Sequence, residues 1–228
     1  MSLTLYTLSQ KNKLTPDVFE LVFKAPHTIT MESGQFITFL LPEIGGRAYS
    51  IAEIKGEDEI VLLIKRWSEE NGGRGGSMAL CDSNIGDEFK AVGPSGHFVL
   101  TQNNNNKLFI GTGTGLVPLY NQILGATESG QSGTLHLLFG IRTQEDIFYT
   151  QELDKISTSN PNFTYDVYLS REEDSHYKHG YTTDGITEDI VNNFKEYYIC
   201  GAPGMIDGVI KKLTDMGVSE ENIFTERY

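Results

Sequence analysis

Cysteine is scarce in this sequence, with only Cys81 and Cys200 among 228 residues. An iron–sulfur cluster usually needs four thiolates, and a disulfide scaffold needs several pairs. We therefore expect neither of these, and we predict no metal site. Any redox chemistry in this chain would have to use an organic cofactor.

Long apolar runs and positive charge are also scarce. No run approaches the ~20 residues that span a bilayer, and the start, MSLTLYTLSQ, lacks the basic and apolar blocks of a secretory signal. The formal net charge is −13 with no Lys/Arg block, which disfavours nucleic acid and anionic membrane surfaces. We expect a cytoplasmic protein that binds neither, and the charge also weakens docking to an acidic electron carrier.

The first hundred residues consist of short β-rich runs separated by Gly, Pro and Asp turns. Close spacing of such runs predicts a small antiparallel β-barrel. One stretch, residues 76–83, has helical spacing instead, and Ser77 is expected to be its N-cap. The predicted strands cover residues 18–26, 34–41, 47–53, 59–66 and 87–100.

The polar run TQNNNNK has no periodicity and separates two different patterns. It therefore predicts a domain boundary, with one domain over 1–101, a linker over 102–106 and a second domain over 107–228. Beyond it, strands at 107–113, 134–141, 163–170, 196–202 and 222–228 alternate with helical patterns at 115–127, 145–157, 185–194 and 205–217. This alternation predicts a doubly wound α/β domain with a five-stranded parallel sheet.

A glycine-rich turn follows the first strand of this second domain. Glycines let the backbone approach a pyrophosphate, and a helix N-terminus supplies unpaired N–H groups and a favourable dipole. The alternative is a tight turn with no ligand, but its position favours a dinucleotide site. The candidate residues are Gly111, Thr112, Gly113, Thr114, Gly115 and Pro118.

The ends of the next two strands bear on the choice of nucleotide. The second strand ends in Gly140, Ile141 and Arg142, without the acidic residue that would hold the ribose of NAD. The third ends in a hydroxyl and a guanidinium, which favours NADPH over NADH. The alternative is that these two residues cap the strand and pair with Glu172 or Glu173. The candidates for phosphate binding and adenine stacking are Ser170, Arg171, Tyr177, Lys178 and Tyr181.

In the stretch RAYS, Arg47 and Tyr49 share one face of a strand, whereas Ala48 and Ser50 share the other. A flavin lying along the strand edge would use such residues, and an ordinary strand would also contain them. The motifs RAYS, GRGGSMAL, GPSGHF, GTGTGLVP, YLSRE and YYICGAPGM occur in this order, with an aromatic residue at the C-terminus. Together they resemble the ferredoxin–NADP reductase superfamily over essentially the whole chain.

The resemblance implies a FAD-binding barrel followed by an NADP-binding sheet, with flavin and nicotinamide meeting in the cleft between them. It implies that Arg47 contacts a flavin phosphate, that the ring of Tyr49 faces the flavin, and that Ser50 donates a hydrogen bond to it; Ala48 belongs to the same motif. Gly75, Gly76 and Ser77 resemble the motif that receives the flavin pyrophosphate.

The run GRGGS, with Arg74 three places before Ser77, is closer to the phthalate-dioxygenase-reductase branch, in which the flavin is FMN. FAD is therefore the expected cofactor and FMN the alternative, just as NADPH is expected and NADH the alternative.

The resemblance also places Cys200 beside the nicotinamide, with Gly201 and Pro203 shaping the loop, although a buried cysteine is otherwise usually only a small apolar residue. The resemblance also implies that a terminal aromatic residue, matched by Tyr228, stacks on the flavin, with an acidic residue, matched by Glu226, just before it. The candidate catalytic residues are Ser50, Cys200, Glu226 and Tyr228.

The implied activity is hydride transfer from NADPH to FAD and electron transfer onward to a separate ferredoxin or flavodoxin, or to a small-molecule acceptor. The alternatives are an NADH-dependent flavin or oxygenase-component reductase, and a non-catalytic nucleotide-binding module.

Overall fold

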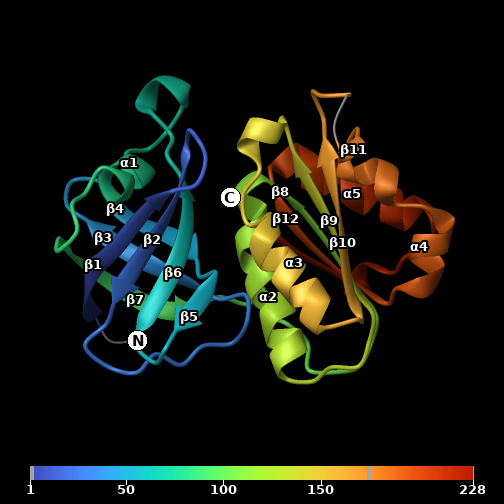
Figure 1. Ribbon diagram of the computed structural model, residues 1–228, viewed down its shortest axis with the longest axis horizontal. Helices are drawn as coiled ribbons and strands as arrows, with labels where there is room; N and C mark the ends of the chain where they lie inside the picture. Colours follow the sequence, from blue (N-terminus) through green and yellow to red (C-terminus); the bar gives the residue numbers. More distant parts are fainter. Residues whose placement is uncertain (1–2, 174–175, 228) are drawn as a thin grey trace. The chain divides into compact units, whose positions relative to one another are not determined.

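The structure, a computed structural model, describes residues 3–173 and 176–227 (Figure 1). The chain divides into two compact units, with the division between Val99 and Leu100. Within the described ranges, no helix has the length and apolar character that crossing a bilayer requires. In the same ranges, no three His, Cys, Asp or Glu side chains are grouped so as to hold a metal ion.

The first unit is a seven-stranded antiparallel sheet in the order β4-β3-β7-β1-β2-β6-β5, with one short helix, α1, over Gly76–Cys81. Every predicted strand of this unit is present. The prediction missed β1, whose last residues, SQKNK, are polar although it pairs with both β2 and β7. The strands are β1 Leu3–Lys13, β2 Val18–Lys24, β3 Phe36–Leu41, β4 Gly45–Ser50, β5 Glu53–Lys55, β6 Glu59–Lys65 and β7 Glu88–Ser95.

Alternate residues of these strands fill the core of the first unit. Leu21 and Phe23 of β2, Phe39 of β3, and Ile60 and Leu62 of β6 are fully buried in a single apolar cluster. A period of two places such residues on one face of a sheet, where their removal from water stabilises the fold. This packed face holds β3 and β4, and therefore the RAYS stretch, in a fixed position.

The second unit is a six-stranded parallel sheet in the order β11-β10-β9-β8-β12-β13. Helices α2 and α3 lie on one face of the sheet, and α4 and α5 lie on the other (Figure 1). All five predicted strands are present, and the sixth, β11, is only two residues long. The strands are β8 Lys107–Thr112, β9 Leu135–Ile141, β10 Phe163–Leu169, β11 Lys178–His179, β12 Glu196–Gly201 and β13 Ile223–Arg227; the helices are α2 Leu116–Glu128, α3 Thr150–Ser159, α4 Glu188–Asn193 and α5 Pro203–Asp215.

The order of the strands places β8 and β12 side by side at the centre of the sheet. From β8 the chain winds outward through β9 and β10, and it then returns to β12 and winds the other way. This is the switch point of a doubly wound sheet, where ligands bind at the carboxyl ends of the strands. The end of β8 is the glycine-rich turn, and the end of β12 is Cys200–Gly201.

At the opposite ends of β8 and β12, the polar run 101–107 surrounds a buried ion pair. Lys107, which is fully buried, lies 3.8 Å from Glu196. The side-chain amides of Asn103 and Asn105 donate to Glu196 Oε1 at 2.6 and 2.8 Å, and the Thr101 hydroxyl donates to Oε2. This run is therefore held by side-chain hydrogen bonds to the second unit.

The predicted helix over 145–157 begins later than expected. Residues Gln144–Asp146 form a 3₁₀ turn, and Tyr149 has a left-handed backbone conformation with φ 65° before α3 starts at Thr150. The Thr143 hydroxyl and the Asp146 carboxylate cap the turn by bonding to each other and to the backbone. Local capping ends the helical pattern there, because the capping side chains compete with continued helix.

Candidate functional site

The turn that joins β8 to α2 depends on glycine at several positions. Gly113 has φ +54°, and a Cβ at Gly115 would overlap the carbonyl oxygen of Cys200. A Cβ at Gly111 would lie 2.8 Å from Leu119 Cδ1. The turn at Gly115 therefore lies against the backbone of Cys200 at the end of β12, which only a residue without a side chain permits.

Helix α2 begins at Leu116, directly after this turn, with Pro118 buried in its first turn. The Leu116 N–H donates to the carbonyls of Gly113 and Thr114 in a 3₁₀ turn over Gly113–Gly115. The N–H groups without a helical partner are therefore those of this turn, where the helix dipole favours an anion. Thr112 and Thr114, on either side of Gly113, are half-buried. The predicted pyrophosphate residues are thus brought together at one strand end, and their arrangement fits a phosphate group.

Cys200 lies at the centre of this region, fully buried in β12. It is paired in register with Gly111 of β8 and with Glu226 of β13. Burial, assisted by the charge of Glu226, raises the pKa of the Cys200 thiol well above 9.0, so the thiol stays protonated at neutral pH. Cys200 is thus a neutral side chain rather than a nucleophile.

The loop after Cys200 is shaped by its glycine and proline. Gly201 has φ +153°, and a Cβ there would overlap the hydroxyl of Thr112 and lie 2.6 Å from Met205 Cε. Pro203 is the first residue of α5, a position where its missing N–H costs nothing. Tyr228, the remaining predicted residue of this end of the chain, lies outside the described residues.

Ser170 and Arg171 follow β10 at the same edge of the sheet. The Ser170 hydroxyl donates to the carbonyl of Ile141 at 3.3 Å, and the Arg171 backbone N–H donates to the carbonyl of Arg142 at 3.0 Å. Within the part of the chain that the structure describes, the exposed guanidinium of Arg171 has no carboxylate within ion-pair distance. Glu172 instead accepts the backbone N–H of Gln144 at 2.9 Å. The guanidinium is therefore presented to solvent beside the strand end.

Lys178 lies in β11 and makes different contacts from those expected of a phosphate ligand. Its ammonium is 2.7 Å from Asp166 Oδ2 and lies over the ring of Tyr168, 5.5 Å from the centroid. Asp166 also lies 3.4 Å from His136, whose pKa burial holds below 6.5. At neutral pH the cation beside Asp166 is therefore Lys178. Sequence analysis missed Asp166, because nothing in a strand pattern shows that a distant lysine pairs with it.

Two further aromatic candidates flank Lys178. Tyr181 is 67% exposed, so its ring is available for stacking. Tyr177 is half-buried.

In the first unit, Arg47 and Tyr49 of β4 do share a face, since a Cβ at Gly76 would lie 2.6 Å from Arg47 Cγ and 2.9 Å from the Tyr49 hydroxyl. The Arg47 guanidinium donates to the carbonyls of Gly46, at 2.8 Å, and Arg74, at 3.1 Å. Its Nε is buried and has no hydrogen-bond partner among the described residues. A buried donor without an acceptor is costly, so this atom fits an acceptor supplied by a ligand.

Tyr49 is more deeply packed than a ring that only faces a ligand. Its ring meets Phe39 edge to face at 6.3 Å, and burial raises the pKa of its hydroxyl to about 12. On the other face of β4, Ala48 is exposed and Ser50 is half-buried.

Gly75, Gly76 and Ser77 form the start of α1. Gly75 is the N-cap residue, with φ +78°, and Gly76 is the first helical residue. The expected N-cap role of Ser77 is wrong, because Ser77 lies inside the helix and its hydroxyl accepts the backbone N–H of Trp67 at 3.0 Å. That bond anchors the preceding loop, and the absence of a side chain at Gly76 lets Arg47 and Tyr49 pack directly against the start of α1.

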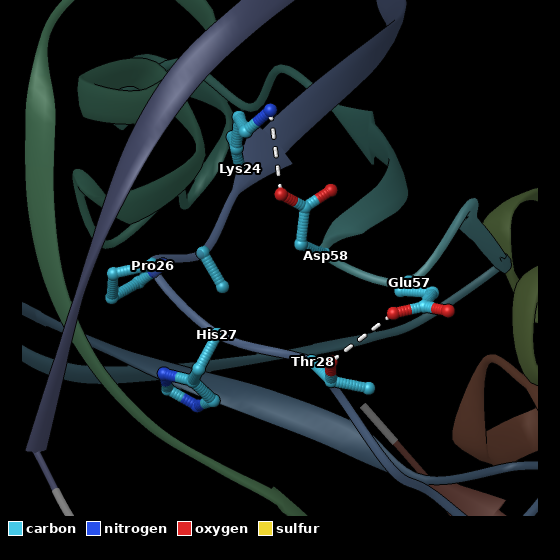
Figure 2. Close-up of a pocket in the computed structure, with 7 residues that line it drawn as sticks. Lys24, Pro26, His27, Thr28, Glu57 and Asp58 are labelled. Carbon is cyan, nitrogen blue, oxygen red and sulfur yellow. Dashed lines mark hydrogen bonds and ion pairs between the residues drawn. The ribbon is translucent and has the colours of Figure 1, made fainter.

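A surface pocket of about 500 Å³ also occurs in the first unit (Figure 2). Two interactions cross its wall: an ion pair from Lys24 to Asp58 at 3.3 Å, and a hydrogen bond from the Thr28 hydroxyl to Glu57 at 3.4 Å. None of the residues predicted from the sequence lines it. Its lining is Lys24, Ala25, Pro26, His27, Thr28, Glu57 and Asp58.

Comparison with known proteins matches two segments of the chain to two families. Residues 5–100 match the family described as oxidoreductase FAD-binding domain, and residues 109–211 match the oxidoreductase NAD-binding domain.

Two curated relatives come from Pseudomonas putida. The toluate 1,2-dioxygenase electron transfer component is 26% identical over 86% of this chain and 58% of its own length. The naphthalene 1,2-dioxygenase system ferredoxin–NAD(P)(+) reductase component is 27% identical over 94% of this chain and 65% of its own. This chain thus spans less than two thirds of either relative.

A solved structure, that of the Amycolatopsis cytochrome P450 reductase GcoB, superimposes with a TM-score of 0.90 and 26% identity. The superposition covers 99% of this chain and 69% of the GcoB chain.

Proposed function

Because the chain belongs to the ferredoxin–NADP reductase superfamily of FAD- and NAD(P)-binding oxidoreductases, we propose that it oxidises NADPH with a bound FAD and passes the electrons to a separate acceptor. The observation that carries the proposal is the meeting of the glycine turn after β8 with Cys200 and Gly201 at the switch point of the sheet. A bound flavin would supply the redox chemistry, accepting a hydride from the reduced pyridine ring.

Under this proposal the first unit binds the flavin. Arg47 donates from its unpartnered Nε to a flavin phosphate, and the start of α1 at Gly75 and Gly76, which packs against Arg47, receives the same group. The Ser50 hydroxyl donates a hydrogen bond to the flavin ring, and the ring of Tyr49 faces the flavin. These roles rest on the family motif, and the buried, unpartnered Nε of Arg47 supports the first of them.

The second unit binds the nucleotide. The N–H groups of the turn over 111–115, at the start of α2, hold the pyrophosphate, and Ser170 and Arg171 hold the 2′-phosphate. Cys200, Gly201 and Pro203 wall the nicotinamide, and the protonated thiol excludes water without adding charge. Glu226, in register with Cys200, supplies the carboxylate of the site, and Tyr228 supplies the terminal ring.

The acceptor is proposed to be another protein, a ferredoxin or flavodoxin, or else a small molecule. The two cysteines of these 228 residues cannot ligate an iron–sulfur cluster, so such a centre would have to lie outside them. Two curated relatives are named as reductase or electron transfer components of dioxygenase systems. A protein acceptor of that kind is consistent with these names.

A second candidate is an NADH-dependent reductase of the same kind. One observation favours it: the Glu172 carboxylate lies beside the end of β10, fixed by the N–H of Gln144. A carboxylate there would accept hydrogen bonds from ribose hydroxyls and repel a 2′-phosphate.

The decisive experiment uses the whole purified protein. We expect it to be yellow, to release FAD on denaturation, and to lose its colour faster with NADPH than with NADH under anaerobic conditions. Release of FMN would correct the cofactor, and faster bleaching by NADH would favour the second candidate. A colourless protein that takes up no flavin would refute the proposal.

Arg171→Ala tests the choice of nucleotide. A hydrogen bond to a charged group is worth about 1.5–3 kcal/mol, so kcat/KM with NADPH should fall roughly tenfold or more while NADH changes little. Steady-state kinetics with both nucleotides measure this. Lys155→Ala, which removes an exposed charge from α3, is the matched control, and equal losses for both nucleotides would contradict the phosphate assignment.

A further inference from the structure

The segment that follows β10 carries most of the predicted nucleotide-specificity residues, and it returns to the sheet at β11. Lys178 and His179 pair in parallel with Tyr168 and Leu169. Two short bonds close the loop: Gly180 N–H donates to the Leu169 carbonyl at 2.9 Å, and the His179 ring lies 2.7 Å from the Glu172 carbonyl. A strand of two residues provides little stability by itself.

The side chain of Lys178 strengthens this short pairing. Asp166 and Tyr168 lie on one face of β10, because they are two residues apart. Lys178 reaches across to both, with its ammonium 2.7 Å from the carboxylate and 5.5 Å from the ring centroid. Tyr168 is 5% exposed and belongs to the core of the second unit. The contact therefore joins a surface loop to the rigid sheet.

Asp166 is itself held in place. His136 of β9 lies 3.4 Å from its carboxylate through Nε2, while Nδ1 lies 2.8 Å from the Thr164 hydroxyl. The carboxylate is thus fixed by the sheet from one side and meets Lys178 from the other. A lysine reaching a nucleotide phosphate would have to leave this partner.

We propose that Lys178 and Asp166 are positioning residues that fix the loop bearing Arg171 and Tyr181, and that Lys178 is not a phosphate ligand. This inference rests on the proposed function, and it adds Asp166 to the residues that determine nucleotide affinity. A positioning contact acts on any nucleotide that uses the loop, whereas a phosphate ligand acts only on the one that carries the 2′-phosphate.

The test compares Lys178→Met and Asp166→Asn in the flavin-loaded protein by calorimetric titration with NADP⁺ and with NAD⁺. Exposed ion pairs are weak, so each variant should raise both dissociation constants by about two- to fivefold, with the NADP⁺/NAD⁺ ratio unchanged. Because the two residues share one contact, the double variant should be no worse than either single variant.

Asp166→Asn separates the two roles, since it keeps the shape of the side chain and frees the lysine. A phosphate ligand so freed would bind NADP⁺ as well as before or better. The proposal is overturned if Asp166→Asn leaves both constants unchanged, or if Lys178→Met weakens only NADP⁺, by tenfold or more.

Lys211→Met, which removes an exposed lysine paired with Asp215 on α5, is the matched control and should change neither constant. An unmodified protein that bound neither nucleotide would refute the proposed function, and this inference with it. An unmodified protein that bound both, with only NADP⁺ weakened in Lys178→Met, would overturn the positioning role alone.

Discussion

The two thiols of this protein are both buried, although they lie in different units. Burial, together with the charge of Asp82, raises the pKa of Cys81 to about 12. Burial likewise raises the pKa of Cys200 well above 9.0. Thiolates are the reactive form, so neither residue is a nucleophile at neutral pH. What Cys200 contributes is its position next to Gly111 and Glu226 rather than its acidity.

We therefore predict that the native protein resists alkylation. At pH 8, iodoacetamide should modify neither Cys81 nor Cys200 on a timescale on which a free thiol reacts fully, because both are buried and protonated. Mass spectrometry should show two additions after denaturation, which serves as the control. Rapid modification of the folded protein would contradict the environment described for these thiols.

Individual residues show how far sequence alone can lead. Glycine positions are readable, since the turn over 111–115 needs close backbone approach and the sequence places glycines there. Side-chain partners are not readable: Ser77 bonds to Trp67, and Lys178 bonds to Asp166, over separations of ten and twelve residues. Such contacts depend on strand register and loop path, which local patterns do not specify.

At the scale of elements, the starts of β8 and β12 are joined by the Lys107–Glu196 pair and the loop wrapped around it. Burial alone would raise the pKa of Glu196, but hydrogen bonds from Thr101, Asn103 and Asn105, with the charge of Lys107, lower it below 4.5. A carboxyl group whose pKa is lower in the folded than in the unfolded state stabilises the fold at any pH above its unfolded-state pKa. This contribution is lost as the pH falls through its folded-state pKa.

Glu196→Gln should therefore make the protein less stable at pH 7 and less sensitive to acid. The buried Lys107 keeps hydrogen bonds to Asn103, Asn105 and Gln131 but loses its counter-charge, which should cost up to about 3–5 kcal/mol in the free energy of unfolding at neutral pH. Below pH 4.5 the wild type should lose stability more steeply than the variant. Urea denaturation between pH 7 and 3 measures both effects.

Glu128→Gln, an exposed glutamate at the end of α2, is the control with the same change of charge. Parallel pH profiles for the wild type and Glu196→Gln would contradict the role of the buried pair.

The elements also differ in how well they can be predicted. Largely apolar runs identify β8, β9 and β12, because strands covered on both faces are apolar along most of their length. The two residues of β11 are too few to show an alternating pattern, and the polar residues at the end of β1 interrupt the pattern of that strand. The order of the strands in the sheet, and the face on which each helix packs, depend on tertiary contacts. The sequence therefore predicts that a doubly wound sheet has a switch point, but not which strands form it.

The 228 residues carry a formal net charge of −13, and this charge affects the rate at which the protein associates with any charged partner. If the acceptor is an acidic carrier protein, the two proteins repel each other at low salt. Raising the ionic strength from about 0.01 to 0.1 M shortens the Debye length from about 30 to 10 Å and should speed electron transfer to such a carrier.

Stopped-flow reduction of the carrier measures this rate, and an uncharged quinone, whose reduction should not respond to salt, is the control. A rate that falls with salt would show that a local basic patch guides docking.

The asparagine run around Glu196 has a consequence for the lifetime of the protein. Asn103 and Asn105 hold the carboxylate through their amide groups, and asparagine is among the least durable side chains on heating. Deamidation of exposed Asn105 would replace a donor by a second anion against Glu196 and turn attraction into repulsion. Slow ageing in storage should therefore begin at this junction, long before the glycine turn or the barrel is affected.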